Sequence, residues 1–304
     1  MIISIGNISL GGTGKTPFVI LIGKYFLEKG ERVCVLSRGY KGKLKYDTNI
    51  ISDGNRFYFT PPMAADEPYL IAKNLKNAVI ITGKDRNKGY ILAKEKFACN
   101  TFILDDGYQH RKMQRDVDIL LLDYQNSVST GLIFPFGYLR EFPSSIKRAD
   151  IIVFTKTNGG KTIPEKVKGY VKGKPIFFSD YRFTSIVSKS EEIPLKHING
   201  EKVLTFSGIA KNKHFFHMLK SVGADIENTF SFRDHHVYTE KELLSILESA
   251  KEKDVKYIIT TEKDYVKIPD NLKEQFYYAK IEIVLNDKKK FFEAIENTYK
   301  KKRP

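Results

Sequence analysis

The 304-residue chain has little cysteine and no long hydrophobic run. Its two cysteines, Cys34 and Cys99, lie far apart, and neither belongs to a C-x-x-C pair, so the sequence indicates no cysteine metal site and no disulfide framework. No stretch of about 18 apolar residues occurs, and a transmembrane helix needs about 20. A signal peptide is not expected either, because Met1–Ile5 is followed at once by a glycine-rich loop. We therefore expect a protein of a reducing compartment that does not span a bilayer.

Acidic residues are outnumbered by basic ones. The chain has 51 lysine and arginine residues against 36 aspartate and glutamate residues, which gives a formal charge of +15. Such an excess favours an acidic partner, namely nucleic acid, an anionic membrane or a phosphorylated substrate. Charge alone does not choose among these partners, and it is also compatible with a surface that is merely soluble.

Short apolar runs alternate with longer helical patterns in the first part of the chain. Their near-continuous hydrophobicity predicts strands buried on both faces, as in a parallel sheet with crossover helices. The predicted strands are Ile2–Ile5, Val33–Leu36, Ala78–Ile81, Phe102–Leu104, Ile119–Leu122, Ile151–Phe154 and Ile176–Phe178. The sequence therefore predicts an α/β domain on a mostly parallel sheet.

A polar stretch at Ser179–Gly200 interrupts this pattern, and a second α/β set follows it. Its expected elements are the strands Val203–Phe206 and Tyr257–Thr260, an extended stretch ending at Phe232, and helices near Lys213–Val222, Glu240–Lys251 and Lys288–Tyr299. We expect two domains, residues 1–185 and a smaller α/β domain of residues 186–304.

A glycine-rich loop follows the first predicted strand and precedes an apolar helical pattern. It matches G-x-x-x-x-G-K-[ST] except at its first position, and its residues are Ser9, Leu10, Gly11, Gly12, Thr13, Gly14, Lys15 and Thr16. The glycines let backbone N–H groups approach a phosphate closely. Lys15 can reach the β- and γ-phosphates of a nucleotide, and Thr16 can bind Mg²⁺. The loop predicts nucleotide binding in a P-loop NTPase-like fold.

The loop alone does not separate a kinase from an ATPase or a GTPase. Its core also resembles partition-type ATPases, which carry a signature lysine just before the first of the two glycines. Leu10 occupies that position and argues against this class. A P-loop switch ATPase with a basic nucleic-acid-binding face remains one alternative, and a kinase of a soluble metabolite is another.

Polar clusters follow several of the predicted strands. Asp105 and Asp106 end an apolar strand in a Walker B pattern, where a carboxylate holds Mg²⁺ directly or through water. The polar residues after them lie where open α/β sheets bind ligands. Leu36–Tyr40 follows another strand, and Asp66–Pro68 precedes a helical pattern. From spacing alone, Asp66 is explained equally well as a helix N-cap.

In order along the chain, these motifs resemble those of the tetraacyldisaccharide 4'-kinase family. The matching segments are Gly6-Asn7, Gly11–Pro17, Leu36–Tyr40, Asp66–Pro68, Asp105–His110, Gly137–Glu141, Phe232–His236 and Thr261–Asp264. The resemblance covers nearly the whole chain. It implies transfer of the γ-phosphate of ATP, with Mg²⁺, to the 4'-hydroxyl of a tetraacylated disaccharide 1-phosphate. The product implied by the resemblance is a lipid A precursor, made at the cytoplasmic face of a Gram-negative inner membrane.

The resemblance also implies roles for individual residues. Asp66 is the expected catalytic base and His235 its partner, in a cleft that the second domain closes, while Lys15 acts on the phosphates. Thr16, Asp105 and Asp106 are expected to serve Mg²⁺. The residues expected to line the substrate site are Arg38, Tyr40, Glu67, Gln109, His110 and Arg140.

Three of these motifs have structural alternatives. His235 and His236 are also explained as a turn pair held by Asp234, and Arg140 is also explained as a surface ion pair with Glu141. The segment Thr261–Asp264 is also explained as a helix-capping loop.

Two features depart from the family pattern. Ala65 stands where members usually have glycine, before the Asp-Glu-Pro motif. Members also usually begin with a hydrophobic membrane-anchoring helix, which this sequence does not show. Either that segment was removed, or this form associates peripherally through basic and apolar surface. We expect an acylated disaccharide phosphate and an anionic membrane surface as partners, and no nucleic acid.

Overall fold

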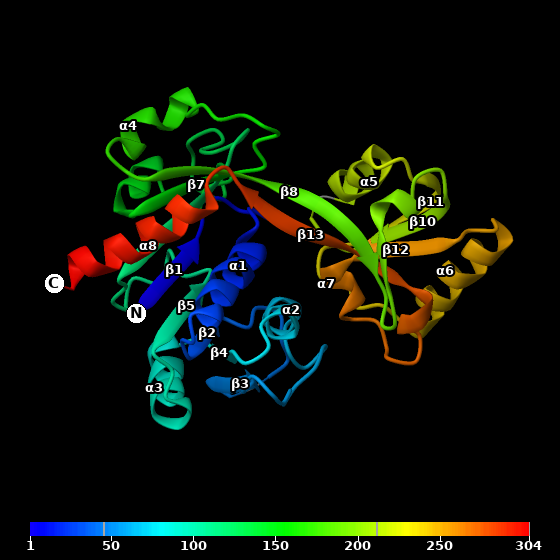
Figure 1. Ribbon diagram of the computed structural model, residues 1–304, viewed down its shortest axis with the longest axis horizontal. Coiled ribbons are helices and arrows are strands. Elements are labelled where there is room, and N and C mark those ends of the chain that lie inside the picture. The colour runs from blue at the N-terminus through cyan, green and yellow to red at the C-terminus, as the bar shows by residue number, and fades with distance from the viewer. Residues whose placement is uncertain (45, 211, 304) are drawn as a thin grey trace. The chain divides into compact units, whose positions relative to one another are not determined.

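The computed structural model describes residues 1–44, 46–210 and 212–303. The chain divides into two compact units, which are Met1–Tyr181 together with Ile283–Pro304, and Arg182–Glu282. It enters the second unit along β8 (Ile176–Val187) and returns along β13 (Tyr277–Leu285), as Figure 1 shows. The second unit is therefore an insertion in the first.

This division corrects the expectation that the second domain runs to the C-terminus. The C-terminal helix α8 (Lys288–Lys302) belongs to the first unit, where Phe292 stacks on Tyr25 with 3.7 Å between ring centroids. Phe291 packs edge-on against both Phe18 and Phe177. The helix therefore belongs to the unit whose aromatic residues bury it, and not to the unit that precedes it in the sequence.

The first unit is built on a mostly parallel sheet with the strand order β8-β7-β6-β1-β5-β2-β4-β3. All seven predicted strands are present, within one or two residues at their starts. The bounds are β1 Ile2–Gly6, β2 Val33–Ser37, β4 Val79–Gly83, β5 Thr101–Asp105, β6 Val117–Asp123 and β7 Ile151–Thr155, with β8 as given above. Every residue of β1, β2, β5 and β7 is buried, as expected for strands covered on both faces.

One edge of this sheet was not predicted. Strand β3 (Thr48–Ser52) pairs antiparallel with β4. The other neighbouring strands in the order from β8 to β4 pair in parallel. Strand β3 is short, and its residues Thr48 and Ile50 are only half-buried. An edge strand of this kind lacks the continuous apolar run that identifies the central strands.

Helices complete the first unit. They are α1 (Lys15–Glu28), α2 (Asp66–Asn74), α3 (Arg86–Phe97), α4 (Lys168–Val171) and α8, with 3₁₀ turns at Pro143–Arg148 and Glu165–Val167. Ala93 of α3 packs with Cys34, Leu36 and Phe102 in one core cluster. Both cysteines are buried and free, as expected.

In the second unit, strands in the order β11-β10-β12-β13 continue the same sheet, and the pairs between these strands are parallel. The elements of this unit are β9 Glu192–Pro194, β10 Lys202–Ser207, α5 Asn212–Ser221, β11 Asp225–Ser231, α6 Glu240–Glu252, β12 Tyr257–Thr261, α7 Glu262–Tyr265 and 3₁₀ turns at Leu195–His197 and Lys273–Gln275. The predicted capping box is present, since Thr239 and Glu242 exchange hydrogen bonds at the start of α6. Within the described part of the chain, no helix combines the length and hydrophobicity needed to cross a membrane.

Candidate active site

The glycine-rich loop joins β1 to α1 and exposes its backbone. Gly11 and Gly14 have φ values of 105° and 86°, which favour glycine. A Cβ atom built at Gly11 or Gly12 would meet no atom within 4 Å, so open space lies beside these residues. Gly14 is the N-cap of α1 and supplies no side-chain cap, so the first N–H groups of the helix remain available for an anion.

Lys15 lies between two polar groups at the ends of neighbouring strands. Its Nζ atom is 3.4 Å from Asn7 Oδ1 and 3.4 Å from Asp106 Oδ1. Asn7 is fully buried and donates to the Ser9 carbonyl at 2.9 Å, which fixes the first turn of the loop. The ammonium is therefore held at the carboxyl ends of β1 and β5, beside the phosphate loop.

The two aspartates that end β5 have opposite environments. Asp105 is only 2% exposed and accepts from Ser37 Oγ at 2.9 Å, while its Oδ1 has no hydrogen-bond partner among the described residues. Burial, together with nearby Glu67 and Asp106, raises the pKa of Asp105 to about 7. Although burial opposes the shift, Lys15 and Arg140 lower the pKa of Asp106. Adjacent carboxyl groups whose pKa values differ in this way are suited to different roles.

Arg140 does not form the surface pair with Glu141 that the sequence left open. Its Nη1 atom donates to both carboxylate oxygens of Asp106, at 2.9 Å and 2.7 Å. Glu141 instead binds Arg148 through two hydrogen bonds of 2.7 Å and 3.0 Å. The structure thus brings Lys15, Asp106 and Arg140 together from three separate sequence motifs.

The two polar residues that follow these aspartates have different surroundings. Gln109 Nε2 donates to the Asn7 carbonyl at 2.9 Å and to Glu141 Oε1 at 3.0 Å, so it joins the phosphate-loop strand to the Arg140 loop. His110 Nε2 is buried with no hydrogen-bond partner in the described parts of the chain. Burial and the nearby Arg86 guanidinium lower the pKa of His110, which favours its neutral form.

The Asp-Glu-Pro motif forms the first turn of α2. Asp66 is the first helical residue, and the N-cap is Ala65, which makes no side-chain capping bond. The N-cap reading of Asp66 is therefore wrong. Ala65 has φ −67° and ψ 149°, an ordinary extended conformation, so the replacement of glycine causes no backbone strain here. Arg38 and Tyr40 follow β2 as exposed residues, and Tyr40 is 64% exposed.

Lys156 and Tyr181 contact the phosphate loop but were not identified from the sequence. Lys156 has φ 59°, lies just after β7, and donates from Nζ to the Gly12 carbonyl at 2.5 Å. The same Nζ is 3.3 Å from Asp123 Oδ2. A Cβ atom at Gly14 would lie 1.6 Å from the Tyr181 hydroxyl, so that hydroxyl packs directly on the loop. Lys156 directly follows β7, and that position was its only available signal, whereas Tyr181 lies within β8 and had no such signal.

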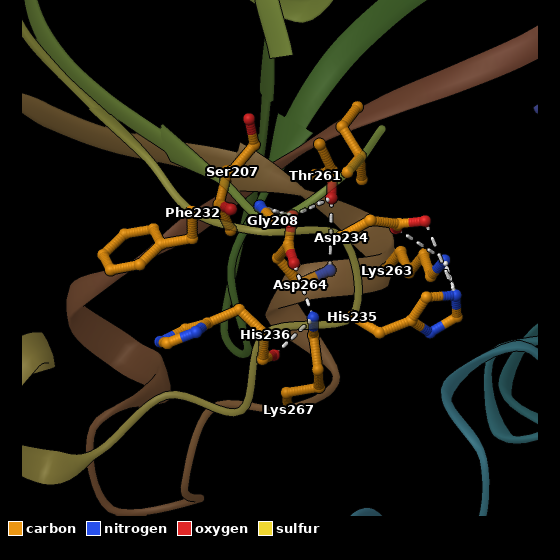
Figure 2. Close-up of polar contacts among 12 residues, drawn as sticks. Ser207, Gly208, Phe232, Asp234, His235, His236, Thr261, Lys263, Asp264 and Lys267 are labelled. Carbon is orange, nitrogen blue, oxygen red and sulfur yellow. Dashed lines mark hydrogen bonds and ion pairs between the residues drawn. The ribbon is translucent and has the colours of Figure 1, made fainter. Parts of the chain in front are cut away.

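A second polar cluster surrounds His235 in the other unit (Figure 2). His235 has φ 64°, and its Nε2 is 3.1 Å from Lys263 Nζ, which also lies 3.5 Å from Asp234 Oδ1. His236 points the other way, stacks on Phe232, and lies 3.1 Å from each carboxylate oxygen of Glu242. The two histidines therefore do not form a pair. His235 Nε2 lies 3.8 Å from Asp234 Oδ2, which is too far for a hydrogen bond.

Asp264 holds this cluster in place. It is fully buried and accepts from Gly208 N at 2.9 Å and from Thr261 Oγ1 at 2.6 Å, and it pairs with Lys267 Nζ at 2.7 Å. Gly208 in turn accepts the backbone N–H of His235 at 3.1 Å. Thr261 does cap α7, as the alternative reading proposed, since its Oγ1 accepts from Asp264 N. The cap also positions a carboxylate that fixes the loop carrying His235.

Comparison with known proteins identifies the family. Residues 1–300 match the family model described as tetraacyldisaccharide-1-P 4'-kinase. The chain belongs to this family. A curated tetraacyldisaccharide 4'-kinase from Geobacter metallireducens is 36% identical over 303 residues, which cover 97% of this chain and 87% of the relative. A tetraacyldisaccharide 4'-kinase from Aquifex aeolicus is 39% identical over 242 residues, which cover 79% of this chain and 73% of the relative.

A solved structure agrees with this membership. The "apo" form of LpxK from Aquifex aeolicus, described as a complex with ATP, has a TM-score of 0.79 and 34% identity, and the match covers 98% of this chain and 88% of that one. The expected α/β fold is confirmed. The chain is an ATP-dependent kinase of bacterial lipid A biosynthesis whose acceptor is a tetraacyldisaccharide. The nucleic-acid-binding ATPase and the soluble-metabolite kinase are set aside.

Proposed function

We propose that the phosphate loop, Lys15, Asp106 and Arg140 form the centre that transfers the γ-phosphoryl group to the 4'-hydroxyl. The observation that carries this proposal is the contact of one carboxylate, Asp106, with both cations beside the loop. Phosphoryl transfer needs little covalent chemistry, so positioning and neutralisation of charge supply most of the catalysis. Lys15 and the amides of the loop bind the phosphates, and Arg140 approaches from another element.

The residues present fit a magnesium ion. Mg²⁺ usually takes one or two carboxylates together with phosphate oxygens and water, and the buried Oδ1 of Asp105, which has no hydrogen-bond partner among the described residues, is an acceptor of this kind. Asp105, Asp106 and Thr16 would hold the ion. When bound, it would neutralise the charge that develops on the transferring phosphoryl group.

Asp66 is the proposed general base and His235 its partner. A sugar hydroxyl is a poor nucleophile, so a carboxylate within hydrogen-bond reach accepts its proton as the bond to phosphorus forms. Asp66 stands in the first turn of α2. His235 is held by its neighbours Lys263 and Gly208. The family motifs support these roles, and Arg38, Tyr40, Glu67, Gln109 and His110 are proposed to line the substrate site.

We further propose that the enzyme works as a peripheral protein at the cytoplasmic face of the inner membrane. The charge of +15 supports attraction to anionic lipid, where each basic residue near the surface contributes on the order of 1 kcal/mol. Screening acts over about 8 Å at physiological salt, so the attraction weakens as salt is added. No nucleic acid partner is proposed.

One assay tests the proposed function. The chain is incubated with γ-labelled ATP, Mg²⁺ and detergent-dispersed tetraacyldisaccharide 1-phosphate, and the lipid product is analysed for label at the 4'-position. Labelled lipid is expected with the unchanged chain and not with Lys15→Ala. Hydrolysis of ATP that DNA stimulates, without labelled lipid, would contradict the proposal, as would transfer only to a soluble acceptor.

A further inference from the structure

A loop of unusual composition precedes Arg140. We name residues 131–142 the aromatic loop, because large apolar side chains stand out from it into solvent. Their exposed fractions are 51% for Leu132, 66% for Phe134, 84% for Phe136, 65% for Tyr138 and 61% for Phe142. Single exposed apolar residues are ordinary, but five within eleven residues concentrate exposed apolar surface on one short loop, and such a concentration marks interaction sites.

The charge pattern of the segment sets it apart from the rest of the chain. Charged residues make up 29% of the sequence, yet residues 124–139 contain none. The run ends at Arg140, which pairs with Asp106. An apolar surface therefore leads directly into the proposed transfer centre.

The aromatic loop is a defined turn. Phe134 N donates to the Leu139 carbonyl at 2.8 Å, and Gly137 N donates to the Ile133 carbonyl at 3.0 Å. A Cβ atom at Gly137 would lie 2.3 Å from the Leu132 carbonyl oxygen, so only glycine fits there. The backbone thus displays the aromatic side chains instead of letting them collapse onto the protein.

Backbone hydrogen bonds tie the aromatic loop to the phosphate loop. Leu10 N donates to the Tyr138 carbonyl at 2.7 Å, and Arg140 N donates to the Ile8 carbonyl at 2.6 Å. Leu10 is itself 41% exposed and extends the apolar surface. What binds the aromatic loop is therefore held beside the bound nucleotide phosphates.

We propose that the aromatic loop inserts into the lipid layer that carries the acylated acceptor. This inference rests on the proposed function, because it takes the acceptor to be a lipid. Phe136 and Arg140 are four residues apart, a span of at most about 14 Å. The polar region on each side of a bilayer is about 5–8 Å thick. Aromatic side chains at the acyl boundary therefore keep Arg140 at the depth of the sugar headgroup.

Lipid is favoured over a second copy of the chain as the occupant. The acceptor of this family carries four acyl chains, and the patch adjoins the residues proposed to act on its headgroup. The charge of +15 attracts the chain to an anionic bilayer but repels another copy of itself.

A single fluorophore tests the insertion. The chain contains no tryptophan, so Phe136→Trp places one indole at the most exposed position of the loop. On vesicles of phosphatidylethanolamine and phosphatidylglycerol, the emission should shift to the blue and be quenched by lipids brominated in their acyl chains. Vesicle-bound protein with the emission of a fully hydrated indole would overturn the proposal. So would a blue-shifted indole in a lipid-free dimer.

Deletion of the apolar groups provides the second test. The double variant Phe134→Ser/Phe136→Ser should bind these vesicles at least tenfold more weakly, because burying one phenylalanine side chain is worth roughly that factor or more. Its KM for the dispersed lipid should rise, while its KM for ATP stays unchanged. Ile91→Ser, which removes an apolar side chain 51% exposed on α3, is the matched control. Equal binding by the double variant and the control would overturn the proposal.

The two tests separate this inference from the proposed function. Loop-dependent binding without labelled lipid product would contradict only the proposed function. Labelled product with vesicle binding that is independent of the loop would contradict only the insertion.

Discussion

One nitrogen of the Arg140 guanidinium, Nη1, lies within 2.9 Å of both carboxylate oxygens of Asp106. Lys15 lies 3.4 Å from the same carboxylate, so one anion faces two cations. The aspartate has φ 52°, a strained value for a residue with a side chain. Strain of this kind is typical of residues held for function. The arrangement gives both cations a defined position before phosphate binds.

Removal of Arg140 is expected to slow transfer more than it weakens nucleotide binding. Loss of one preorganised cation at a developing charge costs about 10²–10³ in kcat. Arg140→Ala should therefore lower kcat by that factor, measured with saturating ATP and lipid. In Arg140→Ala, Asp106 faces only one cation, Lys15. Arg140→Lys keeps a second cation at this position and should therefore restore part of the rate. A normal kcat for Arg140→Ala would place this residue outside the centre.

Lys15→Ala should abolish transfer while the fold stays intact. The Lys15 ammonium is held directly beside the loop that binds the phosphates, between Asn7 and Asp106. Lipid phosphorylation and circular dichroism, measured on the same preparation, check the two halves of this prediction. Near-normal turnover would remove the phosphate loop from the mechanism.

Asp66→Ala should lower kcat by about 10²–10⁴ and leave ATP binding nearly unchanged, since general base catalysis contributes a factor of this size. His235→Ala should behave similarly. The double variant should be little worse than either single variant, because residues that act as a unit are not additive. Additive losses in single-turnover assays would show that the two residues act separately.

Lys156→Met should raise the KM for ATP by about tenfold, because its Nζ holds the Gly12 carbonyl and so the shape of the phosphate loop. Methionine keeps the apolar stem but donates no hydrogen bond. Lys161→Met changes an exposed lysine of the same segment and is the control. If both variants have the same KM, the contact with Gly12 does not shape the loop.

The Glu141–Arg148 pair predicts a pH-dependent contribution to stability. Although burial opposes the shift, hydrogen bonds from Arg148 and Gln109 lower the pKa of Glu141 below its ordinary value of 4.5. A lowered carboxyl pKa stabilises the fold above the unfolded value, and this stability is lost as the pH falls through the folded value. Glu141→Gln should cost about 1 kcal/mol at pH 7, a modest value because the pair is partly exposed.

Urea denaturation at pH 7 and at pH 3.5 checks this prediction. The difference between Glu141→Gln and the unchanged chain should shrink at the lower pH, which lies below the pKa of the unfolded chain, so that the stability given by the lowered folded pKa is being lost. An equal difference at both values would show that packing of the side chain, and not its charge, is responsible.

Hydrophobic runs identified the central strands because the sheet buries them completely. All five residues of β2 are buried, and a run such as Val33–Ser37 has no other stable place in a soluble fold. By contrast, β13 is mostly half-buried, so it lacks a periodic signal and was missed. Long-range packing is equally hidden, which is why α8 was assigned to the wrong unit.

In the proposed site too, local features could be predicted from the sequence, whereas contacts between distant residues could not. The phosphate loop is local, since the eight consecutive residues between β1 and α1 specify its shape. The Arg140–Asp106 pair joins residues 34 positions apart, and the Lys156–Gly12 contact joins residues 144 positions apart. Strand order decides which strand ends are neighbours, and a single sequence does not reveal that order.

Asp116 joins both ends of the described chain, because Oδ2 accepts from Ile2 N at 2.7 Å and Oδ1 accepts from Arg303 Nε at 2.9 Å. With the second unit inserted between β8 and β13, both ends belong to the first unit (Figure 1). Neighbouring ends permit circular permutation. A short glycine-serine linker between them would allow the chain to be reopened within residues 182–282, giving a permuted protein in which that segment forms the two new tails. Its ability to bind ATP would measure how far the nucleotide-binding unit is autonomous.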